Sequence, residues 1–131
     1  MPTYLNPRNT PFEQYGLSPG AAANGMVFAG GMALDTDTLQ RRSDAVTIAD
    51  ETRLCLEEIE EIIEAAGCTR RDIVKVTAYL SDDSYRGEFW GAFKEFFDPG
   101  PYPARCTFVV GIAGGCRVEL DAVAAQPQAG E

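Results

Sequence analysis

The residues best placed to do chemistry are an arginine in one short strand and two carboxylates in the next. Arg105 stands near the start of a strand expected from Pro103 to just before Gly111. Glu119 and Asp121 belong to a strand expected over residues 116–124. The planar fork of an arginine binds a carboxylate through two hydrogen bonds, so these residues could form a small-molecule site. The alternative is a cross-strand salt bridge that binds no ligand.

The two strands are joined by a loose Gly-rich turn, which favours an antiparallel hairpin. Because side chains alternate along a strand, Arg105 and Thr107 should lie on one face, together with Glu119. Cys106 and Phe108 should lie on the other face, packed against helices. We therefore expect Arg105 and Glu119 to meet across the strands, and we expect Cys106 to be a core residue rather than a nucleophile.

Helical periodicity appears in two segments on the N-terminal side of this hairpin. The first runs from about residue 46 to 66, with capping chemistry at Thr47 and Asp50 and a stop signal at Gly67. Its acidic face, which includes Glu58, is typical of a solvated surface. The second runs from about residue 85 to 97. Its aromatic stripe predicts a core-facing helix. The apolar stripe of the first segment is Ile48, Thr52, Cys55, Leu56, Ile59, Ile62, Ile63 and Ala66.

Further strands are expected over residues 26–29, 32–34 and 73–80, and residues 1–23 should form an irregular N-terminal arm with room for a short strand near Tyr4. Gly30 and Gly31 interrupt the first run, either as a kink or as a place where a ligand approaches the backbone. The order of elements predicts a single α+β domain over residues 1–131, a mixed sheet with both helices on one face. The uncovered face should lie inside a symmetric oligomer, with pockets at the subunit boundaries.

Composition excludes several kinds of function. The chain has no histidine, which removes Ser-His-Asp and Cys-His catalysis and the paired-His zinc motifs. Its net charge is −9, and Lys75 and Lys94 are its only lysines, so nucleic acid is not an expected partner. No secretion signal or membrane-spanning run is visible in the sequence, so we expect a cytoplasmic protein with reduced cysteines.

Four motifs resemble the RidA/YjgF family, the reactive-intermediate enamine/imine deaminases. They are PARC at 103–106, VELDAVA at 118–124, AAG at 65–67 and DIVKVT at 72–77. The similarity extends over about residues 15–125. It implies a chorismate-mutase-like fold and a homotrimer whose sheets line a central barrel, with sites between the subunits. It also implies hydrolysis of 2-aminoacrylate-type enamines, through the imine, to 2-oxo acids and ammonia without a metal or cofactor.

The resemblance also assigns roles to individual residues. Arg105 matches the arginine that clamps the substrate carboxylate, and Glu119 matches the glutamate that positions the attacking water. Gly31 and Thr107 match positions whose backbone helps to hold the ligand.

Other positions depart from the family pattern. A tyrosine at the pocket edge is replaced by Leu17, with Tyr15 two residues earlier. Trp90 stands where the second helix usually offers an asparagine, as either a pocket or a core residue, and Cys106 replaces a serine. These changes indicate a diverged subfamily with a larger or more apolar substrate.

Two hypotheses from different classes follow. The first is an enamine/imine deaminase that acts on a small substrate bearing a carboxylate. The alternative is a non-catalytic scaffold that binds small carboxylates, because the tyrosine and asparagine of the family pattern are replaced. Ribonuclease activity has also been attached to this family, but the charge of −9 makes it the weakest of the three.

Overall fold

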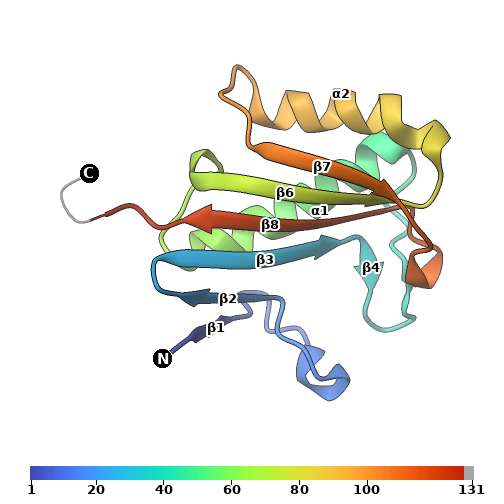
Figure 1. Ribbon diagram of the computed structural model, residues 1–131. Coiled ribbons are helices and arrows are strands. Elements are labelled where there is room, and N and C mark those ends of the chain that lie inside the picture. Colours follow the sequence, from blue (N-terminus) through green and yellow to red (C-terminus); the bar gives the residue numbers. More distant parts are fainter. Residues whose placement is uncertain (129–131) are drawn as a thin grey trace.

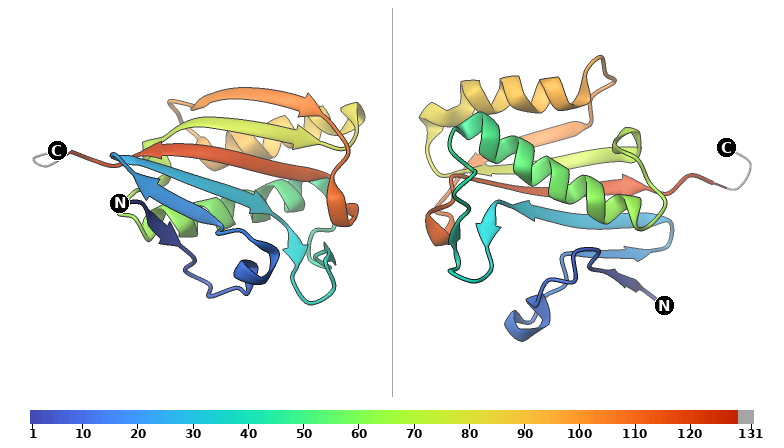
Figure 2. Two further views of the ribbon diagram at one scale, coloured as in Figure 1. Left: turned by 60° about the horizontal axis from the view of Figure 1, so that its bottom comes forward. Right: turned by 180° about the vertical axis from the view of Figure 1, so that it is seen from behind.

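A mixed sheet with two helices on one face forms the body of the protein, and the computed structural model describes residues 1–128 (Figure 1). The helices are α1 (Ile48–Glu64) and α2 (Arg86–Phe97). The strands are β1 (Thr3–Leu5), β2 (Gly20–Ala23), β3 (Met26–Met32), β4 (Leu34–Asp35), β5 (Gln40–Arg41), β6 (Ile73–Leu80), β7 (Ala104–Val109) and β8 (Val118–Ala125). The strand order of the main sheet within these residues is β1-β2-β3-β8-β6-β7. Figure 2 shows from behind that the helices lie side by side across the sheet.

The helices form where their apolar spacing and caps predict them. The Thr47 side chain accepts a hydrogen bond from the Asp50 N–H, and the Asp50 carboxylate accepts one from the Thr47 N–H. Gly67 adopts a φ of 83°, a conformation that ends the helical run. In α2, Phe89, Phe93 and Phe97 are buried against the sheet. The α+β class and the placement of the helices on one face are thereby confirmed.

The N-terminal segment is more regular than the arm expected over residues 1–23. β1 agrees with the short strand expected near Tyr4, whereas β2 was not expected. β1 pairs with β2, which pairs in turn with β3, so both strands extend the sheet. Their small residues, Ala21 to Ala23, gave no clear alternation in the sequence. Gly30 and Gly31 also do not interrupt β3, which continues through them to Met32.

The expected hairpin between the last strands is wrong. β6 lies between β7 and β8, pairing in parallel with β7 and antiparallel with β8. The connection over residues 110–117 crosses the end of β6, where the Val110 N–H donates to the Leu80 carbonyl at 2.9 Å. The Ser81 N–H donates to the Arg117 carbonyl at 3.0 Å on the other side. The eight-residue connection is long enough to step over one strand, which a tight turn would not be.

A buried carboxylate ties α1 to the start of β8. Glu51 is 0% exposed and accepts hydrogen bonds from Arg117 Nε at 2.8 Å and from the backbone N–H groups of Arg117 and Val118 at 2.7 and 3.0 Å. Removing one partner of a buried ion pair leaves the other charge and its hydrogen-bonding groups uncompensated.

We expect Glu51→Ala to lower the free energy of unfolding by about 3 kcal/mol. Urea denaturation at equal protein concentrations measures this loss. Glu57→Ala is the control, because the Glu57 side chain lies on the same helix, is 46% exposed and pairs only at the surface, with Arg53, so the change should alter stability by no more than about 0.5 kcal/mol. Equal stability of the two variants would show that the Glu51–Arg117 pair contributes nothing.

In the described residues, no helix is long and apolar enough to cross a membrane.

Candidate functional site

Arg105 lies on the helix-facing side of the sheet. It is paired with Val76, a fully buried residue of β6. Its guanidinium carbon lies 4.7 Å from the centre of the Phe93 ring and 5.4 Å from that of Phe89. These contacts with α2 hold the guanidinium over the faces of two aromatic rings, and such faces attract cations. Partial burial lowers the pKa of Arg105, but from a value so high that the group stays charged at neutral pH.

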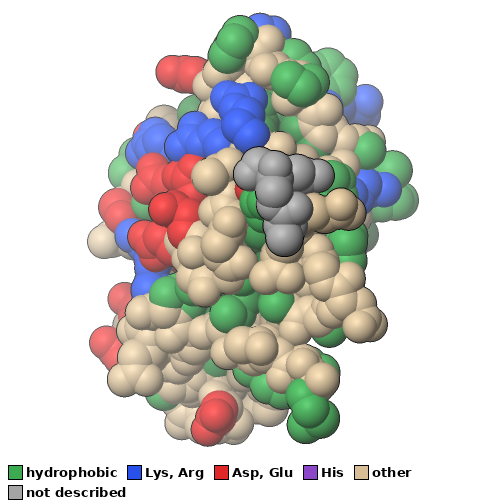
Figure 3. Space-filling model, turned by 90° about the vertical axis from the view of Figure 1, so that its left-hand side faces the viewer, with side chains coloured by type: hydrophobic (Ala, Val, Ile, Leu, Met, Phe, Trp, Pro, Cys, Tyr) green, Lys and Arg blue, Asp and Glu red, His purple; other side chains and the backbone are tan. Residues whose placement is uncertain are grey.

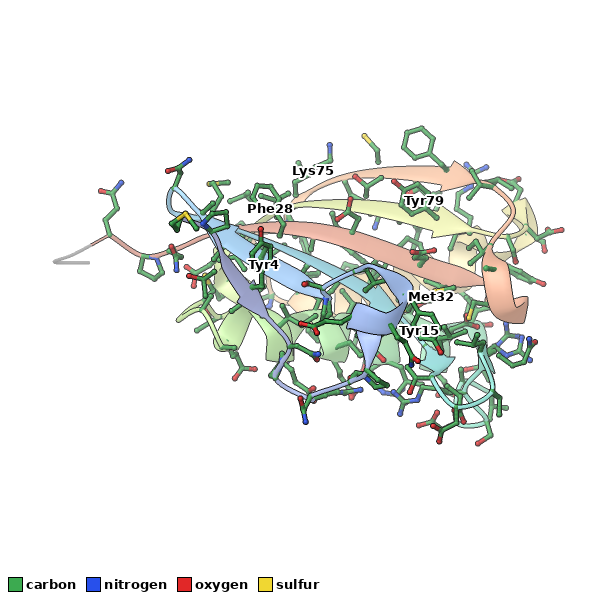
Figure 4. The ribbon with its side chains drawn as sticks, turned by 90° about the horizontal axis from the view of Figure 1, so that it is seen from below. Tyr4, Tyr15, Phe28, Met32, Lys75 and Tyr79 are labelled. Carbon is green, nitrogen blue, oxygen red and sulfur yellow. The ribbon has the colours of Figure 1, made fainter. Side chains whose placement is uncertain are left out.

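Glu119 lies on the opposite face of the sheet, which no helix covers. Its neighbours across the strands are Met32 of β3 and Tyr79 of β6. Figure 4 shows Tyr79, with Phe28 and Lys75, standing on the side away from the helices. Burial and the nearby charge of Asp121 raise the pKa of the Glu119 carboxyl.

The expectation that Arg105 and Glu119 share one face is therefore wrong. The apolar residues of β7 were assigned to the core, but Phe108 is 50% exposed on the open face, where its ring stacks on Tyr79. Cys106 is exposed on that face and is not a core residue. The open face also carries apolar side chains. The apolar residues of β7 therefore did not identify the face of this edge strand that packs against the helices.

Arg105 opens into a hollow of about 400 Å³ at the edge of the sheet, which we call the arginine hollow. Trp90 lines it and is 46% exposed, so this residue belongs to a surface hollow and not to the core. Lys94 lies 5.7 Å from the centre of the Tyr102 ring in the same hollow. The hollow therefore presents two cationic side chains, Arg105 and Lys94, that lie near aromatic rings. Such a site suits the binding of a small anionic group. The lining is Trp90, Phe93, Lys94, Tyr102, Pro103 and Arg105.

A second hollow, of about 540 Å³, follows the free edge of β3 beneath the N-terminal segment, and we call it the arm-side hollow. Glu119, Gly31 and Leu17 all line it. It forms because the pairing of β2 with β3 ends at Gly20 and Ala29, leaving the last residues of β3 without a strand on that side. The remaining lining is Asn6, Pro7, Arg8, Thr10, Phe12, Ser18, Pro19, Gly30, Met32, Leu34, Asp35, Thr36, Arg42, Glu58, Glu61 and Ile62.

Gly31 is required by packing against α1. A Cβ atom at this position would lie 2.3 Å from the carbonyl oxygen of Cys55, far inside van der Waals contact. The backbone of β3 therefore approaches α1 more closely than any other residue would permit. This close approach brings the strand edge within reach of side chains from the next turn of α1.

The predicted site residues thus divide between the two hollows. Leu17, Gly31 and Glu119 line the arm-side hollow, whereas Trp90 and Arg105 line the arginine hollow. Tyr15 and Thr107 line neither hollow. Within one chain, the arginine and the glutamate do not face a common cavity.

Glu58, Arg8 and Arg42 also line the arm-side hollow, and none of them was expected there from the sequence. Glu58 was assigned to a solvated helix face, but its side chain is only 17% exposed. A signal was present, because Glu58 lies three residues after Cys55 and so borders the apolar stripe of α1.

Comparison with known proteins identifies the family. A family model described as Endoribonuclease L-PSP matches residues 8–126. The chain belongs to this family, the RidA/YjgF family. Among its relatives, the 2-iminobutanoate/2-iminopropanoate deaminase of Rattus norvegicus is 35% identical over 80 residues, which are 60% of this chain and 58% of the relative. The match therefore spans less than two thirds of that deaminase.

Other members match over more of their length. A RutC family protein of Synechocystis is 31% identical over 81% of this chain and 82% of its own. The crystal structure of Escherichia coli TdcF with bound serine has a TM-score of 0.74 at 28% identity, covering 85% of this chain and 88% of TdcF. A protein from Rhodopseudomonas palustris, named a probable translation initiation inhibitor, has a TM-score of 0.83 at 26% identity and covers 98% of this chain and 100% of its own. These relatives carry different names on one fold, so activity must be argued from the site.

Proposed function

We propose that the protein hydrolyses the carbon–nitrogen bond of a small enamine or imine bearing a carboxylate, and releases a 2-oxo acid and ammonia. The arrangement of Arg105 supports this most directly, because an exposed arginine fork held over aromatic rings suits a substrate carboxylate. Relatives named as 2-iminobutanoate/2-iminopropanoate deaminases support the reaction class.

We further propose that the site forms between copies of the chain in a homotrimer. Arg105 of one copy would face the arm-side hollow of a neighbour, where Glu119 and Gly31 lie, since the two hollows of one chain are separate. The open sheet face supports such an assembly, because it carries exposed aromatic residues, Tyr4, Phe28 and Phe108. Covering this face with the sheets of the other copies would form the central barrel that the family resemblance implies.

The proposed reaction needs only water and protein groups. Arg105 binds the carboxylate and orients the C=N carbon toward a water molecule that Glu119 holds. The water oxygen bonds to that carbon while Glu119 accepts a proton from the water, the C=N electron pair moves to the nitrogen, and Glu119 passes that proton to the nitrogen. In the tetrahedral intermediate, Glu119 transfers the hydroxyl proton to the amino nitrogen. The C–N bond then breaks, ammonia leaves, and the carbon–oxygen bond becomes the carbonyl of the 2-oxo acid. Gly31 lines this hollow and would bring the backbone of β3 against the ligand.

A direct assay tests the proposal. Imines generated freshly by an amino-acid oxidase should release 2-oxo acid faster in the presence of the protein than in buffer. Saturable binding of 2-oxo acids without any acceleration would favour the non-catalytic scaffold instead. Figure 3 shows Lys and Arg side chains next to Asp and Glu side chains on the face that it draws, an arrangement poorly suited to RNA.

The pH dependence of the proposed reaction should respond to Asp121. Glu119 must be ionised to accept a proton, so activity should fall as the pH drops through its raised pKa. Asp121→Asn removes a repelling charge and lowers that pKa, so the acid limb of kcat/KM should move to lower pH. An acid limb that stays in place, or moves to higher pH, would contradict the assignment of Glu119 as the base.

A further inference from the structure

Glu58 stands where several segments around the arm-side hollow meet. Its Oε2 accepts the Met32 N–H of β3 at 3.1 Å. Its Oε1 lies 3.3 Å from Arg42 Nη1 and 3.5 Å from Arg8 Nη1. One carboxylate from α1 therefore contacts the end of β3, the segment after β5 and the N-terminal segment.

The Met32 N–H has a special position in the sheet. Further back along the same edge of β3, the Gly30 N–H donates to the carbonyl of Pro19, the residue before β2. Two residues on, the Met32 N–H points to the same side, where no strand continues, and the carboxylate takes the place of a strand partner. Gly31, whose backbone belongs to the proposed site, lies between these two bonds.

The arginines around Glu58 have other partners that set their direction. The Arg42 guanidinium also binds the Asp44 carboxylate, with distances of 3.0 and 2.7 Å. The backbone N–H of Arg42 donates to the Ala33 carbonyl. Arg8 also binds Glu61, one turn further along α1, at 2.5 and 3.1 Å. Burial raises the pKa of Glu58, whereas the Met32 N–H and both arginines favour its charged form.

We propose that Glu58 is a positioning residue: it fixes the Gly31–Met32 edge of β3 and fastens the N-terminal segment over the hollow. This inference rests on the proposed function only for its consequence in catalysis. Glu58 does not touch substrate in this scheme. It acts through the Met32 amide, and a misplaced strand edge would misplace the backbone that holds the ligand.

Three variants separate the hydrogen bond from the charge. Glu58→Ala removes both the acceptor for the Met32 N–H and the charge that attracts Arg8 and Arg42. Glu58→Gln keeps an oxygen for the Met32 N–H but loses the charge. Glu57→Gln is the matched control, since Glu57 is the residue of α1 that precedes Glu58. It pairs with Arg53 at 3.3 Å, outside the hollow.

The first readout is hydrogen exchange of the Met32 amide, measured by NMR without substrate. We expect exchange to be at least about fivefold faster in Glu58→Ala, because a hydrogen bond is lost, and to stay within about twofold of the wild type in the other variants. An unchanged Met32 amide in Glu58→Ala, or an increase in Glu57→Gln of the same size, would overturn the proposal.

The second readout is steady-state kinetics on freshly generated imines. We expect kcat/KM to fall about tenfold in Glu58→Ala, mainly through kcat, and less in Glu58→Gln. Wild-type kinetics in Glu58→Ala despite a faster-exchanging amide would overturn the positioning role. A wild-type protein without activity would instead refute the proposed function, while the Met32 amide would still report on Glu58.

Discussion

Replacing Arg105 with alanine is expected to lower kcat/KM for imine hydrolysis by about a hundredfold or more. The guanidinium is the charged fork of the arginine hollow, and the variant would leave the substrate carboxylate without its partner. The fold and the assembly should persist, because a cation–π contact at a partly exposed site contributes only about 1 kcal/mol. Initial rates of 2-oxo acid release and the elution volume in gel filtration measure the two expectations.

Arg105→Lys is the informative control for this loss. Lysine keeps a positive charge near Phe89 and Phe93 but lacks the planar fork, so it should recover only a small part of the activity. Full activity in either variant would show that Arg105 does not bind the substrate. The residue would then be a cation that packs on α2.

Glu119→Gln should cause a loss of similar size, about a hundredfold in kcat, because the amide cannot accept a proton from the attacking water. The substitution keeps the size of the side chain between Met32 and Tyr79, so the sheet should not change. Binding of the carboxylate depends on Arg105, so KM should change far less than kcat. Initial rates over a range of substrate concentrations separate the two constants.

A neighbouring carboxylate supplies the control for Glu119. Asp121 is exposed on the same strand face and is paired with Gly30 and Thr77. Asp121→Asn should retain most of its activity at neutral pH, although its acid limb moves. If Glu119→Gln keeps wild-type kcat, water activation must be assigned to another group.

The helices and the class of fold could be predicted from the sequence because their signals are local. The spacing of apolar residues and the caps at Thr47 and Asp50 placed α1 almost to the residue. The alternation of apolar and polar residues likewise predicted the bounds of β6, residues 73–80. In each case, the buried face is decided by residues within one element.

The pairing of β7 could not be predicted in this way, because strand order depends on residues far apart in the sequence. A Gly-rich connection is compatible with a hairpin and with a crossing over β6, and only the hydrogen bonds of Leu80 and Ser81 decide between them. The wrong prediction that Arg105 shares a face with Glu119 followed from choosing the hairpin. Alternation says which residues share a face, but not which face a partly apolar edge strand turns to the helices.

The candidate site was predicted in its members but not in its geometry. Arg105 and Glu119 were expected from their residue types and spacing, and the family resemblance assigned roles to them and to Gly31. Their separation into two hollows came only from the structure. Glu58 was missed because an acidic residue beside an apolar stripe is usually solvated. Here, the close approach of α1 to Gly31 brings the Glu58 carboxylate within hydrogen-bonding distance of the Met32 N–H.

A site shared between copies of the chain should allow activity to recover when the Arg105→Ala and Glu119→Gln variants are mixed. Each variant alone should be nearly inactive. After the two are unfolded together in equal amounts and reassembled, about one site in four should combine an intact Arg105 with an intact Glu119 from a neighbour. The mixture should therefore show about a quarter of the wild-type activity. A mixture as inactive as its components would contradict a site shared between copies of the chain.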